Sequence, residues 1–247
     1  MNLDNRVCLV TGAAGGIGRA SVLRLADRGA RIIAVDRNDE DSAELIAGSG
    51  GESRVAFFKA DLTEPSATDA LVTRALSQTG QIDVLVNCIG VSSLTSFADV
   101  TVQEWDTVFN VNLRSVFFLT QKVVSHMVAR GSGTVIFVAS AAAKLGGVAV
   151  GPHYAASKAG VICLTKSLAR YGAGYGVTAN CVCPGPTRTA MTDSWDRALT
   201  QEFAASIPLK RYAEPGEIAE AVCFLASPEA GYITGETIDV NGGLVMD

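Results

Sequence analysis

Tyr154 and Lys158 are the two residues whose types and spacing most directly indicate chemistry. They stand four positions apart in the segment His153-Tyr-Ala-Ala-Ser-Lys158, and residues four apart share one face of a helix. An ammonium beside a phenol favours the phenolate and lowers the tyrosine pKa, which suits the phenol to general acid/base catalysis. The pair predicts interconversion of an alcohol and a ketone, although an isolated Tyr and Lys at this spacing is also an ordinary helix-surface pair.

Such a pair needs a scaffold, and the rest of the chain has the pattern of one. Short apolar runs alternate with longer segments of helical periodicity. We predict strands at residues 6–10, 31–35, 54–59, 82–87, 134–139, 177–183 and 237–240, and helices at residues 17–28, 65–79, 102–130 and 154–171. This alternation predicts an α/β fold in which a doubly wound parallel sheet carries helices on both faces, within a single domain over residues 1–247.

A glycine-rich segment follows the first predicted strand and opens the first predicted helix. Its sequence is Thr11-Gly-Ala-Ala-Gly-Gly-Ile-Gly18. Such a turn lets the backbone approach a pyrophosphate closely, and the free N–H groups of the helix face the phosphates. Glycine-rich turns also occur as plain tight loops, but the flanking strand and helix favour a dinucleotide site. We expect cofactor contacts from Gly12, Gly16, Ile17 and Gly18.

Asp36 follows the second predicted strand, eighteen residues after Gly18. A carboxylate at this place accepts hydrogen bonds from the ribose hydroxyls and repels a 2′-phosphate, which favours NAD over NADP. Arg37 weakens that preference, because its guanidinium can reach a phosphate. Asp61, followed by Leu62, is a candidate for holding the adenine edge, or else a cap for the helix predicted from residue 65.

Composition narrows the classes of function. The chain has 247 residues, 48% of them hydrophobic, and a net charge of −5, without the basic block that nucleic-acid binding requires. It shows neither a signal-peptide pattern nor an apolar run of about 20 residues that could span a membrane, so we expect a cytoplasmic protein. The six cysteines form no C-x-x-C pair or disulfide framework and predict reduced, buried thiols. Cys181 and Cys183 lack enough partners for a metal site, and we expect no metal.

The ordered series of motifs resembles the short-chain dehydrogenase/reductase family over residues 6–243. The matching segments are, in chain order, the Thr11–Gly18 turn, Asp61, Asn87-Cys-Ile-Gly90, Asn112 in Asn110-Val-Asn-Leu113, Ser140, Tyr154 with Lys158, Pro184-Gly185, and Asn241-Gly-Gly243. The resemblance implies a single-domain Rossmann fold of about seven strands, an NAD(P)-dependent oxidoreductase and often a homotetramer. Where the family commonly has Asn-Asn-Ala-Gly, Ile89 of this chain adds bulk near the cofactor.

By the same resemblance, the catalytic group is Asn112, Ser140, Tyr154 and Lys158. Tyr154 is expected to exchange a proton with the substrate oxygen, and Ser140 to hydrogen-bond that oxygen. Lys158 is expected to lower the Tyr154 pKa and bind the nicotinamide ribose, and Asn112 to hold a water in a proton relay. Ser140 lacks the Gly-x-Ser-x-Gly setting of a hydrolase nucleophile. Further cofactor contacts are expected from Asn87, Gly90, Pro184, Gly185, Thr187 and Thr189.

The substrate walls are expected at residues 92–94, 144–153 and 189–203. Their candidate apolar lining is Leu94, Val148, Val150, Met191 and Trp195, and His153 faces either the substrate or the surface. The leading hypothesis is an NAD-dependent oxidoreductase that interconverts a secondary alcohol and its ketone. One alternative is reduction of 3-oxoacyl thioesters of acyl carrier protein or CoA. Another is a non-catalytic NAD-sensing protein, which the complete catalytic group argues against.

Overall fold

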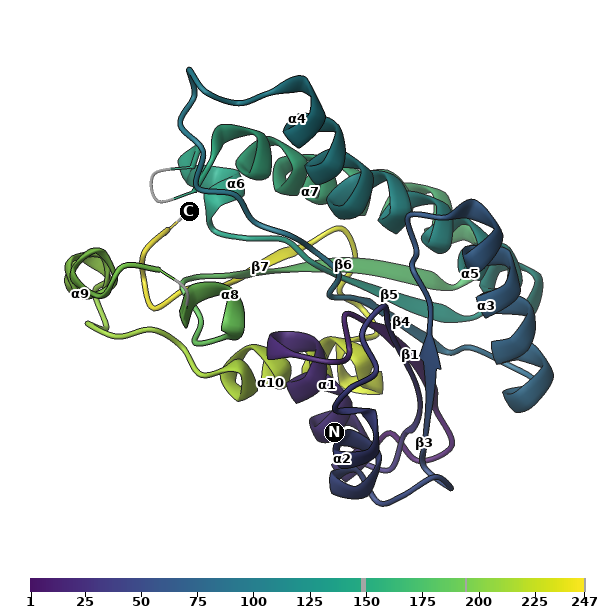
Figure 1. The fold of residues 1–247 in the computed structure, drawn as a ribbon. Helices are drawn as coiled ribbons and strands as arrows, with labels where there is room; N and C mark the ends of the chain where they lie inside the picture. Colours follow the sequence, from purple (N-terminus) through teal and green to yellow (C-terminus); the bar gives the residue numbers. More distant parts are fainter. Residues whose placement is uncertain (148–149, 194, 247) are drawn as a thin grey trace.

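Seven parallel strands form one sheet in the computed structural model, which describes residues 1–147, 150–193 and 195–246. The strands are β1 (Val7–Thr11), β2 (Arg31–Asp36), β3 (Val55–Lys59), β4 (Val84–Asn87), β5 (Gly133–Val138), β6 (Val177–Pro184) and β7 (Thr237–Val240). All the predicted strands are confirmed, with ends that differ by at most two residues. The order β3-β2-β1-β4-β5-β6-β7 reverses direction between β1 and β4 (Figure 1), and ligands of such sheets bind at this point of reversal.

Helices cover both faces of the sheet, as the alternating pattern predicts. On one face lie α3 (Pro65–Thr79), α5 (Ser115–Arg130) and α7 (Pro152–Gly172), and on the other lie α1 (Gly16–Asp27), α2 (Ser42–Gly48) and α10 (Pro215–Ala226) (Figure 1). Successive strand residues feed opposite cores: Ile136 packs with the α1 and α10 side, and Phe137 with the α5 and α7 side. Because both faces are covered by helices, the central strands are mostly apolar and buried, whereas β7 is only half-buried.

The helix predicted over residues 102–130 is interrupted. It comprises α4 (Val102–Phe109), a π-helical turn (Asn110–Arg114) and α5. Turns of this kind occur frequently at functional sites, and here the turn carries the fully buried Asn112. Hydrophobic periodicity did not predict the interruption, because α4, the π-helical turn and α5 follow one another without a break in helical structure.

Three shorter helices lie near the carboxyl edge of the sheet: α6 (Ala142–Leu145), α8 (Ala190–Asp193) and α9 (Arg197–Ser206). The six cysteines are free thiols, and Cys163 is exposed because it lies on the outer face of α7, contrary to the prediction that they are buried. Among the helices described, none has the length and apolar character to cross a membrane.

Candidate active site

A cleft of about 700 Å³ opens at the carboxyl ends of the strands, a volume typical of small-molecule sites. The turn between β1 and α1, the ends of β2, β4, β5 and β6, and the start of α7 all contribute to it. The predicted residues that line it are Gly12, Gly16, Ile17, Gly18, Asp36, Asp61, Leu62, Gly90, Ser140, Tyr154, Lys158, Pro184, Gly185, Thr187 and Thr189. The fold therefore brings together in one cleft residues that lie far apart in the sequence.

The glycine-rich turn has the shape of a phosphate cradle. Gly12 and Gly16 adopt φ values of +66° and +51°, in the left-handed region that favours glycine. A Cβ placed on Gly18 would lie 2.0 Å from the carbonyl oxygen of Gly12, whereas one on Gly15 would meet no atom within 4 Å. The turn is thus tightly packed where Gly18 meets Gly12, whereas Gly15 borders open space in the cleft. With the N–H groups of the first turn of α1 beside it, this arrangement fits the pyrophosphate of NAD(P).

Two carboxylates stand at the far end of the same cleft. Asp36 accepts hydrogen bonds from the backbone N–H groups of Ala14 and Asn38, each at 3.0 Å, and so ties the glycine-rich turn to the end of β2. Asp61 accepts bonds from the N–H and hydroxyl of Thr63 at 3.0 and 2.7 Å. These bonds, together with the positive charge of Arg37, hold the pKa of Asp61 below its usual value. The capping alternative for Asp61 is wrong, because the N-cap of α3 is Glu64.

Tyr154, Lys158 and Ser140 meet at the centre of the cleft. Tyr154 and Lys158 lie on α7, one turn apart, and are 9% and 4% exposed; they are not a helix-surface pair. The hydroxyl of Ser140, which follows β5, stands on the same cleft wall and lowers the pKa of the Tyr154 phenol. The ammonium of Lys158 donates to the carbonyl oxygen of Val138 at 3.0 Å. One acid/base group, one hydroxyl donor and one cation therefore converge on the same space.

The pKa of Tyr154 moves in the direction opposite to that expected from its neighbour. Burial raises it, and the hydrogen bond with Ser140 opposes only part of the effect. Burial also lowers the pKa of the Lys158 ammonium. The prediction of a lowered tyrosine pKa is therefore wrong for this structure. It considered the ammonium alone, whereas removal of the phenolate from water is the dominant cause.

Asn112 lies behind this group and fixes the loop that follows β4. Its side-chain oxygen accepts from the N–H of Val91 at 2.8 Å. Its amide nitrogen donates to the carbonyl oxygen of Val91 at 2.9 Å and to the hydroxyl of Ser157 at 3.0 Å. Asn112 does not line the cleft, but a Cβ on Gly90 would lie 3.0 Å from the Lys158 nitrogen and 3.5 Å from the Asn112 oxygen. The space that a side chain on Gly90 would fill therefore lies between the Asn112 amide and the Lys158 ammonium.

The segment Asn87–Gly90 passes over the end of β1. The Thr11 hydroxyl accepts from the N–H of Cys88 at 3.2 Å, and Cys88 and Ile89 both line the cleft. Asn87 lies beneath it instead, buried, with its amide donating to Thr120 at 3.1 Å. The side chain of Ile89 packs against the core on the α5 and α7 side, so the bulk expected near the cofactor is accommodated there.

The segment after β6 closes the cleft against the glycine-rich turn. The Thr187 hydroxyl donates to the carbonyl oxygen of Gly185 at 2.9 Å. A Cβ on Gly16 would lie 3.0 Å from the methyl group of Thr189. The loops that follow β1 and β6 therefore contact each other through Gly16 and Thr189. Both Thr187 and Thr189 line the cleft.

The predicted substrate walls are confirmed in part. Val150, Met191 and Trp195 line the cleft, and Val148 lies outside the described residues. Leu94 is 53% exposed and does not line it, because the loop turns outward after Ser92. His153 is fully buried, so it faces neither substrate nor solvent. Leu244 also lines the cleft, and no pattern in the sequence pointed to it.

Comparison with known proteins relates this site to named enzymes. The family model described as enoyl-(acyl carrier protein) reductase matches residues 12–245. The 3-oxoacyl-[acyl-carrier-protein] reductase FabG of Thermotoga maritima is 38% identical over 247 residues, covering 100% of both chains. The acetoacetyl-CoA reductase of Allochromatium vinosum is 38% identical over 246 residues, covering 98% of this chain and 99% of its own.

Solved structures show the same similarity in three dimensions. The crystal structure of levodione reductase superposes with a TM-score of 0.93 at 33% identity and covers 98% of each chain. The crystal structure of gox2181 gives a TM-score of 0.94 at 32% identity, covering 98% of this chain and 96% of its own.

Proposed function

The chain belongs to the short-chain dehydrogenase/reductase family, oxidoreductases that act on CH–OH groups with NAD(P), and from this premise we propose that it reduces a 3-oxoacyl thioester. The observation that carries the proposal is full-length similarity to enzymes named as reductases of 3-oxoacyl-acyl carrier protein and of acetoacetyl-CoA. These relatives favour the thioester alternative over the leading hypothesis of a free alcohol or ketone.

The residues of the cleft have the chemistry that this reduction needs. The nicotinamide cofactor supplies the hydride when bound. The Tyr154 hydroxyl donates a proton to the oxygen at C3 of the substrate, and the Ser140 hydroxyl, on the same cleft wall, orients the same oxygen. Lys158 binds the nicotinamide ribose and stabilises the phenolate that Tyr154 leaves behind. Asn112 holds a water that returns the proton from solvent by way of Lys158.

The raised pKa of Tyr154 predicts how the rate depends on pH. Reduction requires the protonated phenol, so its rate should stay constant through neutral pH and fall only on the alkaline side, above the ordinary tyrosine value. Oxidation of the 3-hydroxyacyl thioester requires the phenolate and should rise with pH over the same alkaline range. Initial rates in both directions measure this. A reduction rate that halves between slightly acidic and neutral pH would contradict the assignment of Tyr154.

NAD rather than NADP is the proposed cofactor. The Asp36 carboxylate stands at the end of β2 on the cleft wall, its two oxygens held by Ala14 and Asn38, where it repels a 2′-phosphate. Replacing Asp36 with Ser should remove that repulsion and leave the exposed Arg37 as a phosphate partner. We expect the ratio of kcat/KM for NADH over NADPH to fall by about tenfold or more. A parent enzyme that already prefers NADPH would overturn the proposal.

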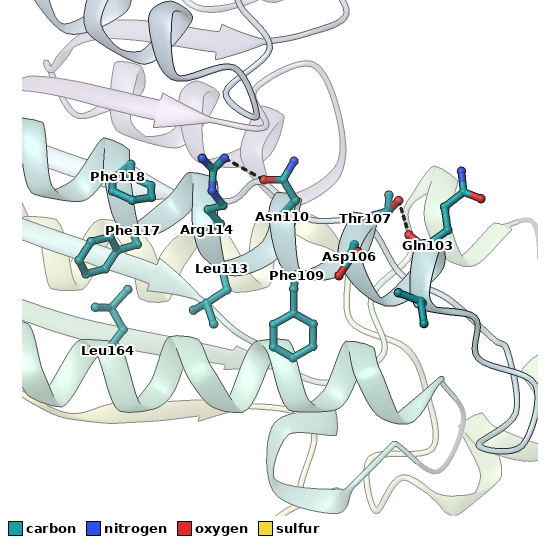
Figure 2. Close-up of a pocket in the computed structure, with 11 residues that line it drawn as sticks. Gln103, Asp106, Thr107, Phe109, Asn110, Leu113, Arg114, Phe117, Phe118 and Leu164 are labelled. Atoms are coloured by element: carbon teal, nitrogen blue, oxygen red, sulfur yellow. Dashed lines mark hydrogen bonds between the residues drawn. The ribbon is translucent and has the colours of Figure 1, made fainter.

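Assembly through the outer face of α4 and α5 is also proposed. A groove of about 1090 Å³ lies there, and Figure 2 shows Phe109 and Leu113 projecting toward α7, with Leu164 near Phe117. Phe117 and Phe118 are 41% and 43% exposed beside it, an apolar area of the kind that marks interaction sites.

The occupant of this groove is proposed to be a second copy of the chain, as part of a homotetramer. Asp106 and Arg114 both line the groove, one on α4 and the other at the end of the π-helical turn. Two copies related by a two-fold axis would bring the same surface of each together, so the aspartate and the arginine of that surface can form ion pairs between the copies. Light scattering should give four times the chain mass, and Phe117→Glu should give a smaller species. A monomeric parent protein would contradict the assembly.

Reduction of a free ketone is the second candidate, favoured by the structural similarity to levodione reductase. The experiment follows the absorbance of the reduced nicotinamide with acetoacetyl-CoA, a 3-oxoacyl-acyl carrier protein and a panel of cyclic and linear ketones. The proposal predicts the highest kcat/KM for a thioester. Turnover confined to free ketones would replace it with the second candidate, and cofactor binding without any turnover would favour a sensor. The free thiols agree with the cytoplasmic location that we propose for this reaction.

A further inference from the structure

Glu104 lies outside the catalytic group, but its carboxylate makes hydrogen bonds to the loop that borders the cleft. It occupies the third position of α4 after the cap Thr101, whose hydroxyl accepts from the Glu104 N–H at 3.1 Å. In a sequence of the form Thr-x-x-Glu, the glutamate ordinarily bonds back to the N–H of the cap residue. Here its Oε1 instead accepts from the hydroxyls of Ser93 and Thr95, at 2.5 and 2.7 Å. The carboxylate is thus directed into the loop between β4 and α4.

That loop is part of the cleft wall. Val91 and Ser92 line the cleft beside Tyr154, and the two residues bonded to Glu104 follow directly. The Ser93 hydroxyl also accepts from the N–H of Thr95 at 3.0 Å. The hydrogen bonds from Ser93 and Thr95 lower the pKa of Glu104, and the neighbouring His153 adds to the effect. The loop is therefore held by an ionised acceptor, which makes stronger hydrogen bonds than a neutral one.

On its other side the loop contacts the start of α7, the helix that carries Tyr154. The Ser93 carbonyl oxygen accepts from the N–H of Gly151 at 2.6 Å. A Cβ on Gly151 would lie 2.7 Å from Cε1 of His153 and 3.0 Å from the carbonyl oxygen of Thr95, so the loop, the glycine and the imidazole are in close contact. Nε2 of His153 lies 3.5 Å from Oε1 of Glu104.

His153 is fully buried, and neither ring nitrogen has a hydrogen-bond partner within ordinary distance among the described residues. Burial of an imidazole without partners is costly, and the Glu104 carboxylate is the acidic group that lies against it, 3.5 Å from Nε2. Because His153 immediately precedes Tyr154, this contact reaches the backbone of the acid/base residue.

We propose that Glu104 is a positioning residue that holds the loop of residues 91–95 against the start of α7 and so fixes the substrate wall relative to the Tyr154 hydroxyl. Two residues then hold the loop, and both come from the helical segment formed by α4 and the π-helical turn. Asn112 holds Val91 and reaches α7 at Ser157, and Glu104 holds Ser93 and Thr95 and reaches α7 at His153. Tyr154 lies on α7 between these two points.

The test compares Glu104→Ala, which removes the acceptor, with Glu104→Gln, which keeps one. Glu104→Ala should raise the KM for the ketone substrate by about tenfold, the effect of losing about one charge-assisted hydrogen bond. Its kcat and the dissociation constant of the cofactor should stay within about twofold of the parent values. Glu104→Gln should restore most of the KM, because its side-chain carbonyl can still accept from Ser93 and Thr95. Glu52→Ala, at an exposed position between α2 and β3 and away from the loop, controls for loss of a negative charge.

A second variant tests the same contact from the loop. Thr95→Val removes one donor without altering α4 or α7 and should raise KM in the same direction. The double variant Glu104→Ala/Thr95→Val should be no worse than Glu104→Ala alone, because both remove one shared interaction. If Glu104→Ala does not fold, Thr95→Val and Glu104→Gln give the same comparison.

Hydrogen exchange supplies a readout that does not depend on turnover. Amides of residues 91–95 should exchange about tenfold faster in Glu104→Ala than in the parent protein, with amides of β1 unchanged. The KM comparison rests on the proposed reductase function; the exchange comparison does not, so failure of the two can be told apart. Parent-like KM and exchange in Glu104→Ala would overturn the inference. So would a fall in kcat, cofactor affinity and melting temperature together, which is the signature of general destabilisation.

Discussion

Replacing Tyr154 with Phe should lower kcat for ketone reduction by about a thousandfold, within the range that general acid/base groups contribute. The ring is buried, and Phe fills the same space, so the change removes the proton and little else. The interaction with the Ser140 hydroxyl is lost, but Lys158 keeps its bond to Val138. Cofactor affinity, measured by fluorescence titration, should therefore change by less than about twofold.

Tyr171→Phe is the matched control for this variant. Tyr171 lies on the same helix, 58% exposed and outside the cleft, and its loss of a hydroxyl should leave kcat unchanged. If Tyr154→Phe retained more than about a tenth of the parent kcat, another group would have to supply the proton. The assignment of Tyr154 as the acid would then fail.

Replacing Gly18 with Ala should abolish cofactor binding in a titration that readily detects it for the parent protein. The added Cβ would stand 2.0 Å from the carbonyl oxygen of Gly12, a contact that requires the turn or the helix to move. Because the obstructing atom is backbone, the adjustment displaces the glycine cradle itself. The free energy of unfolding should also fall, by about 1–3 kcal/mol, the usual cost of overpacking.

Gly174→Ala is the control that distinguishes the steric clash at Gly18 from the general effect of replacing a glycine with alanine. A Cβ at Gly174 meets no atom within 4 Å, and the residue lies in a short helical turn (Ala173–Tyr175) away from the cleft. This variant should bind the cofactor as the parent does. Unaltered cofactor affinity in Gly18→Ala would show that the turn does not hold the pyrophosphate.

The sequence predicted the sheet and much of the site correctly wherever a local pattern of residues is compatible with only one type of structure. The apolar runs that became β1, β4, β5 and β6 are almost entirely buried, which is the pattern expected of strands in a parallel sheet covered on both faces. The strand and helix around Thr11–Gly18 determined the form of the turn. Tyr154 and Lys158 shared a helix face by spacing alone, and the parallel topology then brought Ser140 to them.

The sequence was less informative where an outcome depended on burial or on distant contacts. The direction of the Tyr154 pKa shift followed from desolvation, which neighbouring residue types do not reveal. His153 precedes Tyr154 and was expected at the surface or the substrate, yet it is fully buried against Glu104. The π-helical turn at Asn112 is associated with bonds to Val91, a residue 21 positions away. Such contacts exist only once α4, α7 and the loop are assembled.

The substrate class is tested most directly by product analysis after turnover with the reduced cofactor. The parent enzyme is offered a 3-oxoacyl thioester and, separately, a 2-enoyl thioester, since the matching family model is named for enoyl reduction. We predict that the 3-oxoacyl thioester is consumed and that the product keeps its oxygen at C3 as a hydroxyl. Turnover of the enoyl thioester alone, giving a saturated product, would contradict it.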